Sequence, residues 1–67
     1  MSVARVTEIS STSTQSFEDA IREGLDRATK SLRNVTGAWI KEQRVSLDGG
    51  KIKNYQVNMQ VTFVLDE

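Results

Sequence analysis

The sequence predicts an α+β fold, in which one helix packs on a three-stranded antiparallel sheet in the chain order strand, helix, strand, strand. Three patterns predict this fold. Residues 2–10 are rich in β-branched side chains, residues 17–32 have helical apolar spacing, and two strand-like segments flank the turn sequence LDGGK. A helical crossover makes the first two strands parallel and leaves room between them for the third, so the expected sheet order is 1-3-2.

The composition excludes several classes of protein. The 67 residues suit one small domain, expected over 1–67, and they include no Cys and no His, the usual sources of thiolate and imidazole metal ligands. Nine basic and nine acidic side chains cancel, which argues against a nucleic-acid partner. No apolar run is long enough for a membrane span, and MSVARVTEIS lacks the apolar core of a signal peptide. A cytoplasmic protein is therefore expected.

The first strand and the helix have separate signals. Residues 2–10 are predicted as strand, and SSTSTQS as a polar turn region. Ser16 is the predicted N-cap, with Asp19 at capping-box spacing, and Asn34 marks the predicted end of the helix. Gly24 is expected to pack closely against a strand. The predicted apolar face consists of Phe17, Ala20, Ile21, Gly24, Leu25, Ala28 and Leu32.

The remaining strands are predicted at residues 36–46 and 52–65, with Asp48 and Gly49 as the turn between them. The last strand alternates strictly, so one of its faces should contact the helix. The helix-facing set is Tyr55, Val57, Met59, Val61, Phe63 and Leu65. The opposite set is Asn54, Gln56, Asn58, Gln60, Thr62 and Val64.

This turn fixes the direction in which Trp39, the single Trp, should point. The expected pairs are Ile40 with Val57, Ala38 with Met59, and Trp39 with Asn58. A slip of one residue would send Lys41 into the core, so the first register breaks fewer rules. Trp39 is therefore predicted to face away from the helix, with the amides of Gln56 and Gln60 diagonal to it.

The face opposite the helix is expected to be covered. No charged residue occurs from Asn54 to Leu65, and a long uncharged strand left open invites aggregation. Neighbouring subunits should therefore bury Trp39, Val45 and Val64 in a closed homo-oligomer. Two alternatives stay open for Trp39: it packs into a subunit interface, or a planar ligand stacks on it.

The sequence offers no recognisable catalytic machinery. Without His or Cys no familiar nucleophile–base pair can be assembled, and the DGG segment lies in a hairpin, unlike a phosphate-binding loop. An enzyme is not expected. The carboxylates show no spacing that locates a metal site. Arg44 and Lys41 are candidate charged donors for a ligand phosphate, although ordinary solvated strand charges explain them as well.

Over its whole length the chain resembles the dodecin family. The similarity lies in STSTQSFEDAI, TKSLRNV, KEQR, a Gly-rich hairpin and NYQVNMQVTFVLDE. This resemblance implies a hollow homododecamer of β-α-β-β subunits that stores or buffers flavin, each ring stacked between Trp side chains and hydrogen-bonded by a Gln. The implied ligand is FMN or a related flavin such as riboflavin or FAD.

The resemblance also assigns residues. Gln56, in the segment YQV, matches the Gln that binds the ring edge. The slot of the stacking Trp falls at Gly37, and Trp39 lies two residues later, facing the same way about 7 Å further along the strand. The alternative is a shell of the same fold that binds no flavin, with Trp39 filling the cavity.

Overall fold

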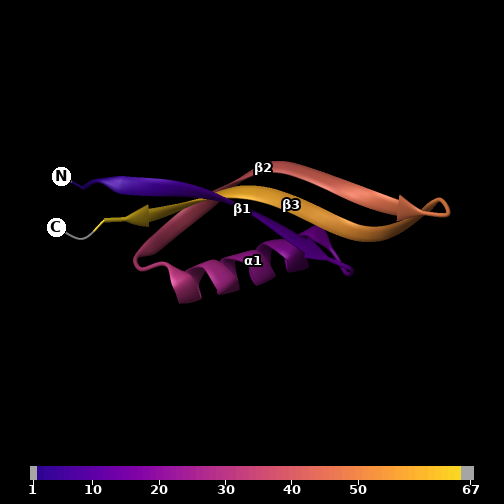
Figure 1. The fold of residues 1–67 in the computed structure, drawn as a ribbon, viewed down its shortest axis with the longest axis horizontal. Helices are drawn as coiled ribbons and strands as arrows, with labels where there is room; N and C mark the ends of the chain where they lie inside the picture. The colour runs from indigo at the N-terminus through magenta and orange to yellow at the C-terminus, as the bar shows by residue number, and fades with distance from the viewer. Residues whose placement is uncertain (1, 66–67) are drawn as a thin grey trace.

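The computed structural model describes residues 2–65 and contains one helix and three strands. These are β1 (Ala4–Ser13), α1 (Phe17–Ser31), β2 (Val35–Asp48) and β3 (Lys51–Val64). All strand pairing is antiparallel in the order β1-β3-β2, as predicted, and α1 lies along one face of the sheet (Figure 1). No helix within residues 2–65 has the length and apolar character needed to cross a membrane.

The core lies between α1 and the centre of β3. Val57, Met59 and Val61 are fully buried against Ala20 and Ala28 of the helix. The alternation of β3 is thus confirmed, because the odd-numbered residues face the helix and the even-numbered residues face away. Around this core pack partly buried side chains, namely Ile9, Phe17, Ile21, Leu25, Leu32 and Val35.

Gly24 is the point of closest approach between helix and sheet. A Cβ atom at this position would lie 2.6 Å from Met59 Cε and 3.0 Å from Ser11 Cβ. The expected close packing of Gly24 against a strand is confirmed, since only a residue without a side chain lets α1 approach β1 and β3 this closely.

The N-terminus of α1 is capped, but not by the reciprocal capping box. Ser16 Oγ accepts from the Asp19 backbone N–H at 3.0 Å, which confirms the predicted cap. Asp19 Oδ2 instead accepts from Ser13 Oγ at 2.7 Å. Ser13 Oγ in turn accepts from the backbone N–H groups of Gln15 and Ser16, at 2.9 and 3.4 Å. The buried Ser13 hydroxyl therefore connects the end of β1 to the start of the helix.

Two predicted boundaries are wrong by three residues, and the others by two or fewer. The first strand was expected to end at residue 10, yet β1 continues to Ser13 because Ser11, Thr12 and Ser13 pair with β3. The helix ends at Ser31, before Asn34, which has a positive φ of 60° in the connection to β2. Asn tolerates this left-handed conformation better than most residues, so Asn34 turns the chain after the helix has ended.

The predicted hairpin turn is also wrong. Asp48 pairs with Lys51, so the two turn residues are Gly49 and Gly50, with φ values of 60° and 80°. Two consecutive positive φ angles are typical of a type I′ turn, and two glycines adopt them without steric cost. The observed pairs replace the predicted ones: Ile40 with Met59, Ala38 with Val61, and Trp39 with Gln60.

Register irregularities in β2 change which side chains share a face. The register shifts between Val35 and Gly37, between Ile40 and Glu42, and between Ser46 and Leu47, whereas β1 pairs with β3 without a shift. Val45 consequently lies opposite Tyr55, on the helix side of the sheet. Its predicted place on the same face as Trp39 is wrong, because the irregularity at Lys41 reverses the alternation expected for the residues that follow.

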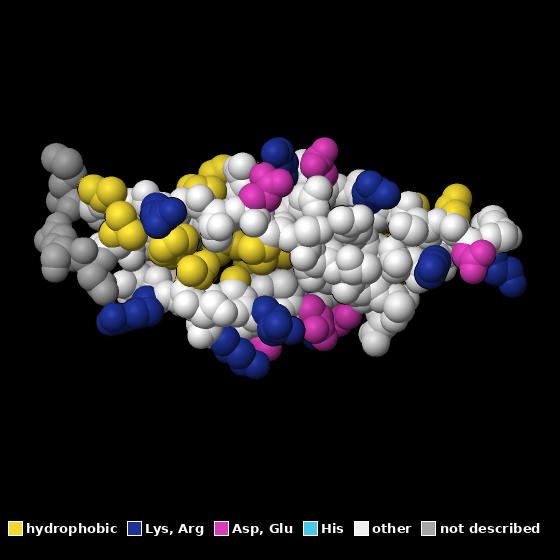
Figure 2. Space-filling model, viewed as in Figure 1, with side chains coloured by type: hydrophobic (Ala, Val, Ile, Leu, Met, Phe, Trp, Pro, Cys, Tyr) yellow, Lys and Arg dark blue, Asp and Glu magenta, His cyan; other side chains and the backbone are white. Residues whose placement is uncertain are grey.

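The helix covers only part of its face of the sheet. The β2–β3 hairpin extends past the N-terminal end of α1 (Figure 1), and Leu47 and Ile52 near its tip are 61% and 51% exposed. Ile40, which was predicted to pair with the helix-facing Val57, is 37% exposed because α1 packs mainly on β1 and β3. Figure 2 shows hydrophobic side chains concentrated between sheet and helix, with charged side chains along both outer sides.

Candidate functional site

The candidate site is the sheet surface that faces away from α1. We call it the amide face and define it by Trp39 together with Gln56, Asn58 and Gln60 of β3. Opposed residues of an antiparallel pair share a face, so the pairing of Trp39 with Gln60 places the indole on this surface. The predicted direction of Trp39 is therefore confirmed, although its expected partner, Asn58, is wrong.

Trp39 is unusually accessible for a Trp. It is 52% exposed, and no described residue stacks on its ring. Gly37, two residues earlier and opposite Thr62, has nothing within 4 Å of the position where a Cβ atom would lie. The surface beside the indole is thus open, and it leaves room for a planar group on the outer side of the sheet.

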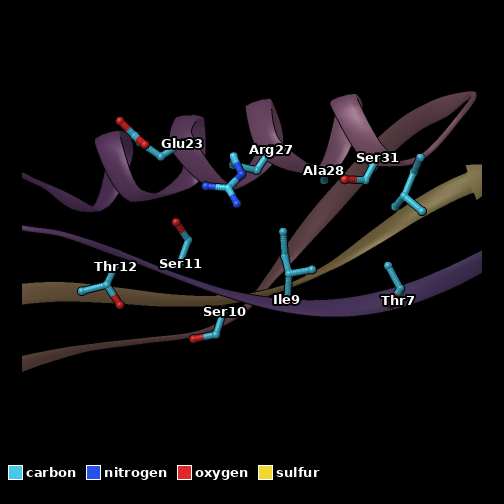
Figure 3. Close-up of a pocket in the computed structure, with 11 residues that line it drawn as sticks. Thr7, Ile9, Ser10, Ser11, Thr12, Glu23, Arg27, Ala28 and Ser31 are labelled. Carbon is cyan, nitrogen blue, oxygen red and sulfur yellow. The ribbon is translucent and has the colours of Figure 1, made fainter.

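Gln56, on the central strand β3, pairs with a residue of each neighbouring strand. Thr12 is its partner on β1 and Arg44 its partner on β2. Gln56 Nε2 donates to Ser10 Oγ at 2.8 Å, which leaves its carbonyl oxygen and its second N–H without a hydrogen bond in residues 2–65. Ser10 and Thr12 point away from the helix (Figure 3), consistent with their place on the amide face.

The neighbouring strands bring charge to a face that β3 alone would leave uncharged. Asn58 Nδ2 donates to Glu42 Oε1 at 3.1 Å, and Lys41 Nζ forms an ion pair with Glu8 Oε1 at 3.2 Å. Sequence reasoning missed Glu8, Ser10 and Glu42. The alternation of side chains along β1 could have placed Glu8 and Ser10 on this face. Glu42 could not be found in this way, because it reaches the face only through the irregularity at Lys41.

The structure brings together some predicted site residues and separates others. Arg44 lies beside Gln56, and Lys41 is held by Glu8. Trp39 lies further from Gln56 than predicted: its partner, Gln60, is four residues from Gln56 along β3, a separation of about 13 Å. Asn58 and Glu42 occupy the position between them.

A groove lies on the helix side of the sheet, at its β1 edge. It has a volume of about 610 Å³ and lies between α1 and β1 (Figure 3). Thr7, Ile9 and Ser11 point into it from the strand, and Arg27 reaches toward it from the helix. None of the predicted site residues lines this groove.

Metal ligands are not clustered in the single subunit. Within residues 2–65, no group of three or more Asp, Glu, His or Cys side chains is placed to hold a metal ion. Glu8 and Glu42, the carboxylates of the amide face, already contact Lys41 and Asn58. This surface has the donors and acceptors for an organic ligand with a planar part and polar substituents.

Comparison with known proteins identifies relatives over nearly the whole chain. The family model described as Dodecin matches residues 3–66. The dodecin of Thermus thermophilus is 37% identical over 65 residues, which cover 97% of this chain and 94% of that protein. A protein of Mycobacterium tuberculosis named calcium dodecin is 33% identical over 63 residues, covering 94% of this chain and 89% of the relative.

Comparison with solved structures leads to the same family as the sequence matches. The dodecin from Streptomyces davaonensis superposes with a TM-score of 0.93 at 41% identity, with 98% of this chain and 97% of that chain covered. The calcium-chelating dodecin of Mycobacterium tuberculosis, whose structure is described as having a novel calcium-binding site, gives a TM-score of 0.83 at 34% identity, covering 96% and 91%. On the family match, the sequence identities and the shared fold, the chain belongs to the dodecin family.

Proposed function

We propose that this protein binds and stores a flavin, with the isoalloxazine ring stacked on Trp39 and its polar edge hydrogen-bonded by Gln56. The observation that carries the proposal is an open indole on a face of amides, with the hydrogen-bonding capacity of Gln56 only partly used. We expect FMN or a related flavin, riboflavin or FAD, as the ligand. We expect a binding protein and not an enzyme.

The chemistry of the two residues fits a flavin ring. Stacking of aromatic rings contributes about 0.5–1.5 kcal/mol beyond the area that it buries. The amide of Gln56 offers both a donor and an acceptor, which suits a ring edge where an N–H adjoins a carbonyl. Two hydrogen bonds at one edge orient the ring, and the indole supplies most of the contact area.

The site is best completed by a second subunit. Trp39 and Gln56 of one chain are about 13 Å apart along β3, so a ring stacked on one indole is reached more easily by Gln56 of a neighbouring copy. The amide face also exposes Val6, and the hairpin exposes Leu47 and Ile52, apolar surface that neighbouring subunits would cover. We propose a closed homo-oligomer, the dodecamer that the family resemblance implies.

Trp39 takes over a role that the resemblance assigns to another position. The typical stacking Trp corresponds to Gly37, where this chain has open space. Gly37 and Trp39 both lie on the amide face, so the aromatic ring is moved along β2 without changing the face of the sheet. The same shift supports the alternative, a shell in which Trp39 fills the cavity and excludes flavin.

Arg44 is the better of the two candidate phosphate contacts. It lies opposite Gln56 and makes no ion pair within residues 2–65, whereas Lys41 is paired with Glu8. A guanidinium presents several donors in a planar fork that matches phosphate oxygens. We therefore expect Arg44→Ala to weaken FMN more than riboflavin.

Titration of FMN fluorescence tests the proposal. Saturable quenching is expected at micromolar protein. Gln56→Ala should weaken binding by about 1–3 kcal/mol because ligand groups lose their partner, and Trp39→Ala should abolish quenching by stacking. Asn54→Ala, on the same face beside the hairpin, is the matched control and should bind like the parent. If the parent protein leaves FMN emission unchanged, the result would instead support the alternative, a shell in which Trp39 fills the cavity and excludes flavin.

A further inference from the structure

The amide of Asn58 has an orientation that the chain itself imposes. Its Nδ2 donates to Glu42 Oε1 at 3.1 Å. A carboxylate only accepts hydrogen bonds, so the NH₂ end of Asn58 must face Glu42 and its carbonyl oxygen must face the other way. Gln56 is not constrained like this, because its partner Ser10 is a hydroxyl that can accept or donate.

This contact leaves two oxygen atoms exposed that can accept hydrogen bonds from a ligand but cannot donate them. Asn58 Oδ1 and Glu42 Oε2 have no hydrogen bond within residues 2–65. Both groups can take a donor from a ligand, and neither can give one. Asn58 is two residues from Gln56 along β3, about 7 Å away, and it lies between Gln56 and the position paired with Trp39.

We propose that Asn58 and Glu42 form a subsite for the hydroxyl groups of a polyol chain, a proposal that rests on the flavin-binding function above. A chain of neighbouring hydroxyls offers several O–H donors, and adjacent acceptors of the carboxylate and amide type suit it. In riboflavin and FMN this chain is the ribityl group, attached to the middle of the ring system. When the polar edge of the ring meets Gln56, the ribityl group leaves the ring close to Asn58, the next residue of β3 on the same face, whichever subunit supplies the indole.

The subsite also explains why a carboxylate occurs on this face. A phosphate at this point would be repelled by Glu42, whereas Arg44, two residues further along β2, presents the opposite charge beside it. Hydroxyls at Glu42 and a phosphate at Arg44 would divide the side chain of FMN between two neighbouring positions. Glu42 is thus a determinant of ligand specificity, separate from the residues that hold the ring.

The test compares riboflavin with lumiflavin, which carries a methyl group in place of the ribityl chain. Both ligands are titrated into the parent, Glu42→Gln and Glu8→Gln. The two variants remove the same charge from the same face, but only Glu42 orients Asn58. Glu42→Gln should weaken riboflavin about tenfold, the typical effect of losing a charged acceptor, and leave lumiflavin within about twofold. Glu8→Gln should preserve the parent's ratio of the two affinities.

The outcomes separate this inference from the proposed function. If Glu42→Gln keeps the parent's ratio, or if Glu8→Gln shifts it equally, the subsite is refuted while flavin binding stands. A parallel loss of both ligands in Glu42→Gln would show a structural effect and would also refute the subsite. If the parent binds neither flavin at 100-fold excess over micromolar protein, both proposals are overturned.

Discussion

Replacing Ser13 by Ala is expected to destabilise the subunit more than any other single change of a hydroxyl near the helix start. Ser13 is buried, and its Oγ donates to Asp19 at 2.7 Å and accepts from the Gln15 backbone N–H at 2.9 Å. A hydrogen bond to a charged group contributes about 1.5–3 kcal/mol. The substitution also leaves backbone donors unpaired, so we expect the free energy of unfolding to fall by about 2–3 kcal/mol.

Urea denaturation at fixed protein concentration measures this effect, because association shifts apparent stability. Ser16→Ala, which removes one cap bond, should cost about 1 kcal/mol, and exposed Thr14→Ala less than about 0.5 kcal/mol. For a domain of this size, Ser13→Ala should lower Tm by roughly 8–24 °C. If Ser13→Ala is no worse than Thr14→Ala, the bridge between β1 and α1 does not stabilise the fold.

Three further predictions follow from packing and exposure. Gly24→Ala should lower the free energy of unfolding by about 1–2 kcal/mol, because the new Cβ would lie 2.6 Å from Met59 Cε. Gly37→Ala, with open space around the new Cβ, should leave the stability unchanged. Equal urea midpoints for the two variants would contradict this reasoning. Met59→Ala should cost about 2–5 kcal/mol as the largest fully buried side chain, and a smaller loss than for half-exposed Ile40→Ala would refute the assignment of the core. Light scattering at micromolar concentration should give a mass many times 7.5 kDa, and a monomeric mass with a cooperative thermal transition would refute the oligomer.

Much of the fold follows from the sequence because its signals are local and agree with one another. The three-and-four spacing around Gly24 and the strict alternation about Met59 each identify one buried face, and these two faces fit together in only one way. The direction of Trp39 was predictable for the same reason. An error of two residues in register leaves Trp39, which precedes the irregularity at Lys41, on its predicted face.

The register could not be predicted, because LDGGK contains two possible two-residue turns. Asp48-Gly49 and Gly49-Gly50 both suit a hairpin, and the structure adopts the second. The irregularities in β2 have no local signature either, since they depend on how two long strands twist against each other. For this reason Val45 was placed on the wrong face.

For the candidate site, the face of its two central residues could be predicted from the sequence, but the residues around them could not. Trp39 and Gln56 stand out by residue type, and the structure places both on the amide face. Glu42 reaches Asn58 only through the irregularity at Lys41, so its role follows from pairing and not from spacing. A polar contact between two strands can be predicted only when their register is known, and the sequence does not determine this register.

The central claim is that a flavin ring stacks on Trp39, and the emission of this residue tests it most directly. Trp39 is the single Trp of the chain, so protein fluorescence excited at the indole reports on one position. Titration with riboflavin, corrected with free N-acetyltryptophanamide for absorption by the ligand, should quench this emission saturably, with the same dissociation constant as flavin quenching. Flavin binding that leaves Trp39 emission unchanged would contradict the stacking, and absence of any binding would contradict the proposed function.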